Sequence, residues 1–274
     1  MKQDMQKTKM QVDAKPAQWS HLKTFTQARI GLGHTGISLP TTAQLKFNVD
    51  HALARDSVNT PLDIKALTQE LAAEEITSIQ VHSQATNRTE YLQRPDFGRR
   101  LNDHSKILLS KAEQAMQADV ALVLVDGLSS IAVQRHGSKL VTDLIYAFQQ
   151  QNISCSPVII AEQGRVAIGD EIGEILNAQS VLLIVGERPG LSSPDSLGIY
   201  YTYAPKLGLN DAKRNCISNI RPSGLPIEEA VSKVLWLIQQ SFERKLSGVN
   251  LKDTSQKALT KSNQSMGNFL LPKP

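Results

Sequence analysis

Three short runs of consecutive apolar residues mark the second half of the chain and predict its core. They are Val120–Val125, Pro157–Ala161 and Val181–Val185. Runs of this length that are rich in β-branched residues are typical of strands buried on both faces of a parallel sheet. Helical patterns alternate with them, over Ser130–Gln150, Gly169–Asn177 and Pro226–Leu246. This alternation predicts an α/β fold, with a Rossmann-like, mostly parallel sheet domain over residues 116–250.

The chain before residue 116 is more polar and predicts a small helical N-terminal region over residues 23–115. One helix is expected over 41–58, with Thr41 or Thr42 as its N-cap. A second is expected over 61–74, with Thr60 as N-cap and Pro61 at the first helical position. A third is expected from Phe97 to Ala118, while Ile76–His82 is consistent with either a short strand or a loop.

The distribution of charge changes the meaning of a sequence pI near 9.0. Residues 1–46 and residues 244–274 each carry a net charge of +5, whereas the body between them carries −6. A nucleic-acid-binding face should be basic within the folded body, so this balance argues against a nucleic-acid partner. The sequence instead predicts a flexible basic arm over 1–22 and a basic tail over 251–274.

The sequence lacks the signals that several classes of protein would show. No apolar stretch reaches the roughly 18–20 residues that span a bilayer, and the N-terminus has no apolar segment typical of a secretory signal. Two cysteines in 274 residues fit a reducing compartment, so a cytoplasmic protein is expected. The six histidines show no zinc-binding spacing, so no metal site is expected.

A glycine motif, Gly31–Gly36, has the G-x-G-x-x-G spacing of a dinucleotide-binding loop. That function requires a strand before the motif and a helix that opens at it. The preceding residues, 24–29, are polar, and the next helix is expected only after Pro40. The motif is therefore not interpreted as a dinucleotide site.

Candidate site residues follow the ends of the predicted strands, where α/β proteins bind ligands. The segment 186–219 is expected to be a long irregular loop, in which Glu187 would either bind a ligand or pair with Arg188. Cys216 would be a core thiol or a small group packed against a ligand, and no neighbouring histidine suggests a nucleophile.

Two other turns each allow a purely structural interpretation as well as a ligand-binding one. Residues 126–129 form either a loop capped by Ser129 or Ser130, or a contact with a ligand. Asp170, Glu171 and Glu174 are expected to be caps and surface residues at the start of a helix, rather than metal ligands.

Several separate strings carry a family resemblance. They read ARIGLGHTGISLPTTAQLKF (28–47), QRPDFGRRL (93–101), VDGLSS (125–130), GRVAIGDEIGEIL (164–176), GERPG (186–190) and CISN (216–219). From Ala28 to about Asn250, the chain resembles the small (light) chain of ethanolamine ammonia-lyase, an adenosylcobalamin-dependent enzyme.

The resemblance implies a function shared between two kinds of chain. The reaction would convert ethanolamine to acetaldehyde and ammonia through radicals, with catalysis on a large subunit and assembly into a higher hetero-oligomer. This chain would supply no catalytic residue and would close one side of the cobalamin with Val166, Glu187 and Cys216. The chain also lacks the D-x-H-x-x-G box that supplies a cobalt ligand in some cobalamin enzymes. The loop at 31–36 would contact the large chain, and in some organisms the pathway is housed in a bacterial microcompartment.

Two other functions remain open at this point. A stand-alone Rossmann-like enzyme for a nucleotide or small acid would use Asp126, Ser129 and Glu187 in its cleft. A purely structural scaffold subunit would not need Glu187 or Cys216 at all.

Overall fold

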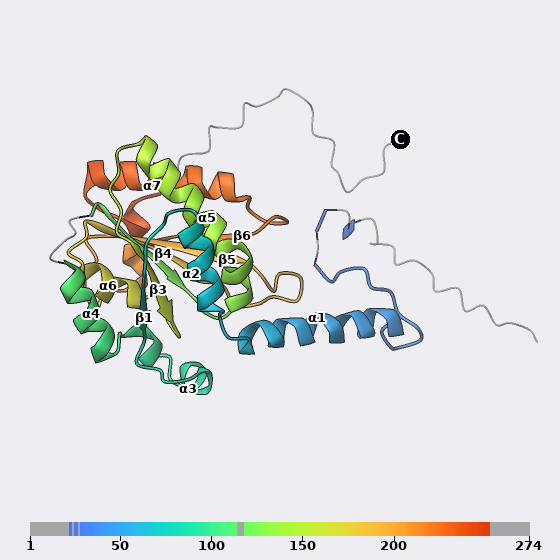
Figure 1. Ribbon diagram of the computed structural model, residues 1–274. Coiled ribbons are helices and arrows are strands. Elements are labelled where there is room, and N and C mark those ends of the chain that lie inside the picture. Colours follow the sequence, from blue (N-terminus) through green and yellow to red (C-terminus); the bar gives the residue numbers. More distant parts are fainter. Residues whose placement is uncertain (1–21, 24, 27, 114–117, 253–274) are drawn as a thin grey trace, which may run out of the picture.

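The computed structural model describes residues 22–23, 25–26, 28–113 and 118–252. Its centre is a six-stranded sheet with the strand order β1-β3-β2-β4-β5-β6 (Figure 1). The strands are β1 (Ser78–His82), β2 (Val120–Val125), β3 (Val158–Glu162), β4 (Ser180–Gly186), β5 (Leu197–Tyr203) and β6 (Arg214–Ile220). The first four in this order run parallel, and β5 is antiparallel to both of its neighbours. The predicted α/β, mostly parallel fold is confirmed.

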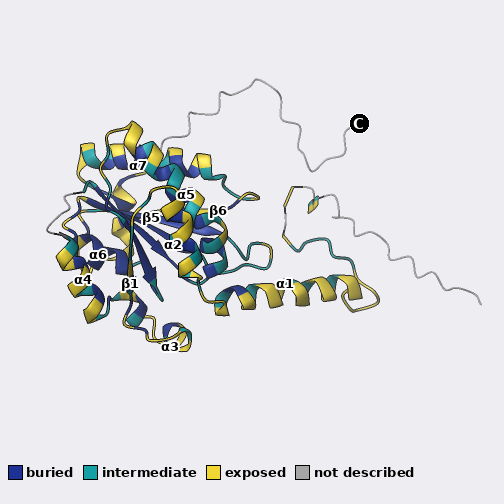
Figure 2. Cartoon of the chain, viewed as in Figure 1, coloured by how far each residue is buried: buried dark blue, intermediate teal, exposed yellow. Residues whose placement is uncertain are grey.

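Helices cover both faces of the sheet. They are α1 (Thr41–Asn59), α2 (Ile64–Ala73), α3 (Arg88–Gln93), α4 (Asp103–Glu113), α5 (Ser130–Gln150), α6 (Ile168–Ile175) and α7 (Ile227–Arg244). Helices α2, α5 and α7 bury their apolar residues against one face, and α4 and α6 against the other. Helix α1 extends away from this body and has one buried residue, Ser57 (Figures 1 and 2).

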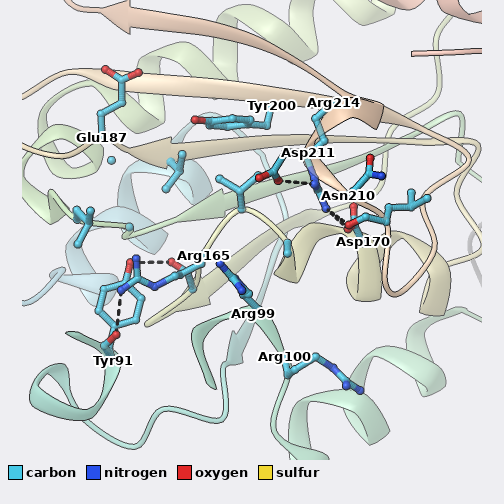
Figure 3. Close-up of a pocket in the computed structure, with 18 of the residues that line it drawn as sticks. Tyr91, Arg99, Arg100, Arg165, Asp170, Glu187, Tyr200, Asn210, Asp211 and Arg214 are labelled. Atoms are coloured by element: carbon cyan, nitrogen blue, oxygen red, sulfur yellow. Dashed lines mark hydrogen bonds and ion pairs between the residues drawn. The ribbon is translucent and has the colours of Figure 1, made fainter. Parts of the chain in front are cut away.

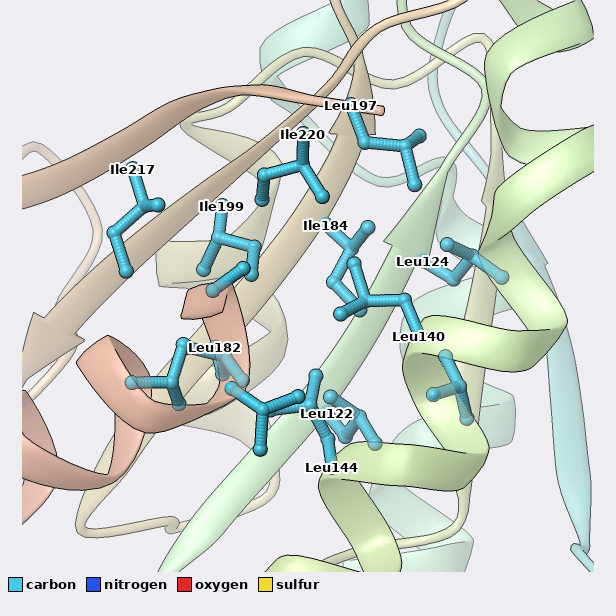
Figure 4. Packing of buried hydrophobic residues seen from close by; sticks show 14 of the residues in the cluster. Leu122, Leu124, Leu140, Leu144, Leu182, Ile184, Leu197, Ile199, Ile217 and Ile220 are labelled. Atoms are coloured by element: carbon cyan, nitrogen blue, oxygen red, sulfur yellow. The ribbon is translucent and has the colours of Figure 1, made fainter. Parts of the chain in front are cut away.

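The alternation of side chains along β2 explains why its sequence is apolar at every position. Leu122 and Leu124 pack with α5 and α7 (Figure 4), whereas Val123 and Val125 pack with α6 on the opposite face. All six residues of β2 are buried. Full burial of one such aliphatic side chain stabilises the fold by about 1.5–3 kcal/mol, so a strand apolar on both faces belongs at the centre of the sheet.

In the N-terminal region the structure settles one open alternative and corrects the caps of two helices. The segment left open as strand or loop forms β1, which pairs with β3 at the edge of the sheet. No side chain caps α1, which begins after Pro40. Thr60 ends α1 by bonding Asp56 O, so α2 begins at Ile64 with Asp63 as its cap.

The helix expected from Phe97 to Ala118 starts later than predicted. A 3₁₀ turn, η2 (Phe97–Arg99), comes first, and α4 begins at Asp103. Its expected last turn, the arm over 1–22 and the tail over 251–274 lie wholly or almost wholly outside the described residues. Among the residues that are described, no helix is both long and apolar enough to cross a membrane.

The long loop expected over 186–219 was the main error in the predicted architecture, because this segment contains β5 and β6. Leu197, Ile199 and Tyr201 alternate along β5 and are fully buried in the core beneath α5 and α7. The register of β5 against β6 shifts between Leu197 and Ile199. Polar residues and this irregularity obscure the period-two pattern that identifies a strand.

The connections of β2 and β3 create a crevice at one edge of the sheet. The chain leaves β2 toward α5 on one face, and it leaves the neighbouring β3 toward α6 on the other. Adjacent strands whose loops diverge in this way form the ligand-binding crevice of open α/β sheets.

The carboxylate of Asp126, at the end of β2, joins the two loops. It accepts hydrogen bonds from Gly127 N (2.8 Å), Gln163 N (3.0 Å) and Gly164 N (3.1 Å). Arg88 Nη1 lies 3.7 Å from the carboxylate. Burial raises the pKa of Asp126 to about 6, while Arg88 and the three amides favour the ionised form. At neutral pH the group is therefore an ionised carboxylate with its hydrogen bonds made inside the protein.

We expect Gly127→Ala to lower the free energy of unfolding by about 2–4 kcal/mol, because it overpacks this turn and strains its backbone. Gly127 has φ +59°, and a Cβ there would lie 2.3 Å from Gly186 O. Gly36→Ala is the matched control, since Gly36 has φ +61° but open space around it. Urea unfolding of the full chain, followed by circular dichroism, measures both. Equal losses for the two variants would contradict the close approach.

Candidate functional site

A cavity of about 930 Å³ lies at the carboxyl ends of β2, β3 and β4 (Figure 3). Segments from both halves of the chain line it, including the turns after these strands, the 3₁₀ turn η2 and the segment before β6. The lining residues used below are Tyr91, Arg99, Arg100, Arg165, Val166, Asp170, Glu187, Arg188, Tyr200, Asp211 and Arg214. The cavity is thus at the place that the divergence of the β2 and β3 loops predicts.

Val166 lies in the turn between β3 and α6 and lines the cavity. It is half-buried and packs against the core beneath α4 and α6. Its backbone carbonyl accepts from Gly169 N (3.2 Å), which joins the turn to the start of α6. Val166 therefore offers the cavity an apolar surface on a fixed backbone.

Glu187 follows β4 and also lines the cavity. Its backbone N–H donates to Ser196 O (3.0 Å), and its carboxylate accepts from Asn219 N (3.2 Å). No ion pair joins Glu187 to Arg188 in the described part of the chain, so the carboxylate keeps free lone pairs for a hydrogen-bond donor.

Cys216 does not line the cavity but is one side chain away from it. It lies on β6, directly opposite Tyr200 of β5, and Tyr200 lines the cavity. Burial by neighbouring atoms raises the pKa of the Cys216 thiol, although a hydrogen bond from Tyr200 lowers it. A thiol with a raised pKa is a poor nucleophile. The structure thus brings together Val166 and Glu187 and places Cys216 at the rim.

The acidic residues at the start of α6 are not surface caps, as the sequence suggested for Asp170 and Glu171. Both are buried. Asp170 pairs with Arg214, which also bonds Asp211 (2.6 Å). Glu171 accepts from Leu101 N (2.7 Å) and Arg100 (3.0 Å).

These ion pairs hold the residue after η2 and the start of β6 against α6, beside the cavity. Arg100 and Arg214 are far from α6 in sequence, so no local pattern could reveal them. Glu174 is exposed, as expected, and accepts from Leu207 N (2.8 Å).

Two residues of the alternative enzymatic hypothesis are structural. Asp126 ties the loops together beneath the cavity, and Ser129 caps α5 by accepting from Ala132 N (3.2 Å). Neither lines the cavity. The described residues also contain no group of three or more side chains that could hold a metal ion.

Residues that the sequence did not single out complete the site. Arg99, Arg165 and Tyr200 all line the cavity. Arg99 and Arg165 occur inside two strings of the family resemblance, which was the available signal. Tyr200 was hidden in the segment expected to be a loop.

Comparison with known proteins identifies the family. The family model for the ethanolamine ammonia-lyase light chain matches residues 16–252. The ethanolamine ammonia-lyase small subunit of Pseudomonas syringae pv. tomato is 48% identical over 281 residues, which cover 99% of this chain and 98% of the relative. The small subunit from Pseudomonas fluorescens Pf0-1 is 50% identical, covering 93% of this chain and 95% of its own. That of Ralstonia nicotianae is 48% identical, with coverages of 92% and 94%.

These matches extend over nearly the whole length of both partners in each comparison, and they include every segment that lines the cavity. The chain therefore belongs to the ethanolamine ammonia-lyase light chain family, the small subunits of a carbon–nitrogen lyase of ethanolamine degradation.

Proposed function

We propose that this chain closes one side of the adenosylcobalamin site of ethanolamine ammonia-lyase and binds the large catalytic subunit. The observation that carries the proposal is the cavity at the carboxyl ends of β2, β3 and β4, with Val166 and Glu187 in its wall and Cys216 beside Tyr200 at its rim. The relatives are named small subunits, which implies a large partner subunit. Assembly into a higher hetero-oligomer is part of the proposal.

The residues present fit the periphery of a corrin. Its rim carries amide side chains, whose N–H groups suit a carboxylate acceptor such as Glu187, and its hydrocarbon parts suit Val166. Arg165 also lines the cavity and forms no ion pair with a carboxylate of the described chain. The cavity has the size of sites for drug-sized ligands, about 300–1,000 Å³. Because cobalamin is larger, the cavity would hold one part of it and leave the rest to another chain.

These groups suggest which roles belong to the cofactor, to this chain and to the large subunit. When bound, adenosylcobalamin supplies the radical that starts the conversion of ethanolamine to acetaldehyde and ammonia. Glu187 and Cys216 would orient the cofactor, and Val166 would exclude water from its edge. We assign no catalytic residue to this chain and place catalysis on the large subunit.

We expect the two subunits to be active only as a pair. Co-expression of this chain with the large ethanolamine ammonia-lyase chain of the same organism should give a complex that releases ammonia from ethanolamine when adenosylcobalamin is added. Each chain alone should release none, because each supplies only part of the site. A failure to associate, or ammonia release by the isolated small chain, would contradict the proposal.

We expect Glu187→Gln to weaken cobalamin binding by the complex about 5- to 30-fold, which corresponds to about 1–2 kcal/mol for a lost hydrogen bond to a charged group. Cys216→Trp should weaken it by at least as much, because the indole would project into the rim beside Tyr200. Isothermal titration of the purified complex measures both affinities. Glu229→Gln, at an exposed position of α7, is the control.

The same titration separates the proposal from the scaffold alternative. Unchanged affinity in both variants, with the complex still assembled, would show that the chain holds the complex together without contacting the cofactor. Gel filtration of each variant complex provides the check on assembly.

A further inference from the structure

The arginines that line the cavity divide into two groups. Arg100 pairs with Glu171, and Arg214 pairs with Asp170 and Asp211, so the charges of these two are balanced inside the protein. Arg99 and Arg165 form no ion pair with any carboxylate of the described chain, although both line the cavity. Arg188 also lines the cavity without an ion pair in the described chain, but it follows Glu187 in the sequence, so that segment carries one charge of each sign. The Arg99–Arg165 wall therefore has an excess of positive charge.

The backbone brings the two unbalanced arginines together from distant parts of the sequence. Arg165 N donates to Gly98 O at 2.7 Å, which joins the β3–α6 turn to η2. The approach requires a glycine, because a Cβ at Gly98 would lie 2.9 Å from Arg165 Cγ. In Figure 3, Arg99 and Arg165 lie next to each other on the side of the cavity away from Glu187.

Arg165 is held in place before any ligand arrives. Its guanidinium stacks over the Tyr91 ring at 4.5 Å, and Nη2 donates to Tyr91 O at 3.0 Å. The Tyr91 hydroxyl in turn donates to Gly164 O at 3.1 Å. The Nε of Arg165 is buried and makes no hydrogen bond in the described structure. A fixed guanidinium loses little conformational entropy when it binds an anion.

A half-buried guanidinium without a carboxylate partner is unfavourable, and an anion bound at the wall would offset its charge. Asp170, which lines the cavity, and its neighbour Glu171 are already paired with Arg214 and Arg100. Arg99 and Arg165 have no carboxylate partner in the described chain, and two neighbouring guanidinium forks in a cavity wall suit the oxygens of a phosphate.

We propose that Arg99 and Arg165 form a phosphate subsite that binds the phosphodiester of the cobalamin nucleotide loop. This inference rests on the proposed function, since it takes cobalamin as the ligand of the cavity. The phosphodiester lies against the Arg99–Arg165 wall, and the amides of the corrin rim reach Glu187 on the other side. The separation of charge across the cavity thereby orients the cofactor.

Two corrinoids that differ by a phosphate test the subsite. The assembled complex of small and large subunits is titrated with cobinamide, which lacks the nucleotide loop, and with cobinamide phosphate. The variant is Arg99→Gln, because Arg99 is exposed and its loss leaves the packing of Arg165 on Tyr91 intact. Arg94→Gln, on the same segment but outside the cavity wall, is the matched control.

We expect Arg99→Gln to weaken binding of cobinamide phosphate and of cobalamin by about 10-fold or more, from the loss of a charge-assisted hydrogen bond. Binding of cobinamide should not change, and Arg94→Gln should change neither. Arg99→Lys should recover part of the loss, because it retains the charge without the planar fork.

Equal loss for cobinamide and cobinamide phosphate, or no loss for either, would overturn the phosphate subsite while leaving the proposed function intact. A wild-type complex that assembles but binds none of the three corrinoids would overturn the proposed function itself. The two failures are therefore distinguishable in one set of titrations.

Discussion

The buried carboxylate of Asp126 links the two loops on which the cavity depends. Three backbone amides from the β2–α5 and β3–α6 turns converge on it, and Arg88 supports it from α3. Arg88 also donates to Gly127 O (2.9 Å) and to Val58 O (2.6 Å), so the end of α1 joins the same network. A buried charge is tolerated only when its hydrogen bonds are made. Because of this requirement, the geometry of each turn depends on that of the other. The positions of Arg165 and Val166, which lie in the β3–α6 turn, depend on it too.

The sheet forms the base of the cavity, and ion pairs hold the segments that form its walls. The central strands are apolar on both faces, so the polar groups gather where the strands end. Arg214 and Arg100 then hold the segment before β6 and the turn η2 against α6. Under the proposed function, the large subunit would complete the site that these walls form in part.

The parts of the fold that the sequence predicted are those set by local pattern. Val120–Val125 and Ser130–Gln150 form the expected strand and helix because hydrophobic period and the cap at Ser129 agree. The antiparallel strands β5 and β6 were missed because Arg214, Asn215 and Asn219 interrupt the apolar alternation of β6, and because the register of β5 against β6 shifts between Leu197 and Ile199. In the site, Glu187 could be inferred from its place after a strand. The pairing of Asp170 with Arg214 could not, because it depends on tertiary contact alone.

The most direct test of the account is a structure of the assembled two-subunit complex with cobalamin bound, determined by cryo-electron microscopy. We expect the corrinoid to lie between the subunits, with Val166, Glu187 and Cys216 in contact with it and the Arg99–Arg165 wall facing its phosphate. A cofactor enclosed by the large subunit alone, with this cavity facing solvent or protein, would contradict the account.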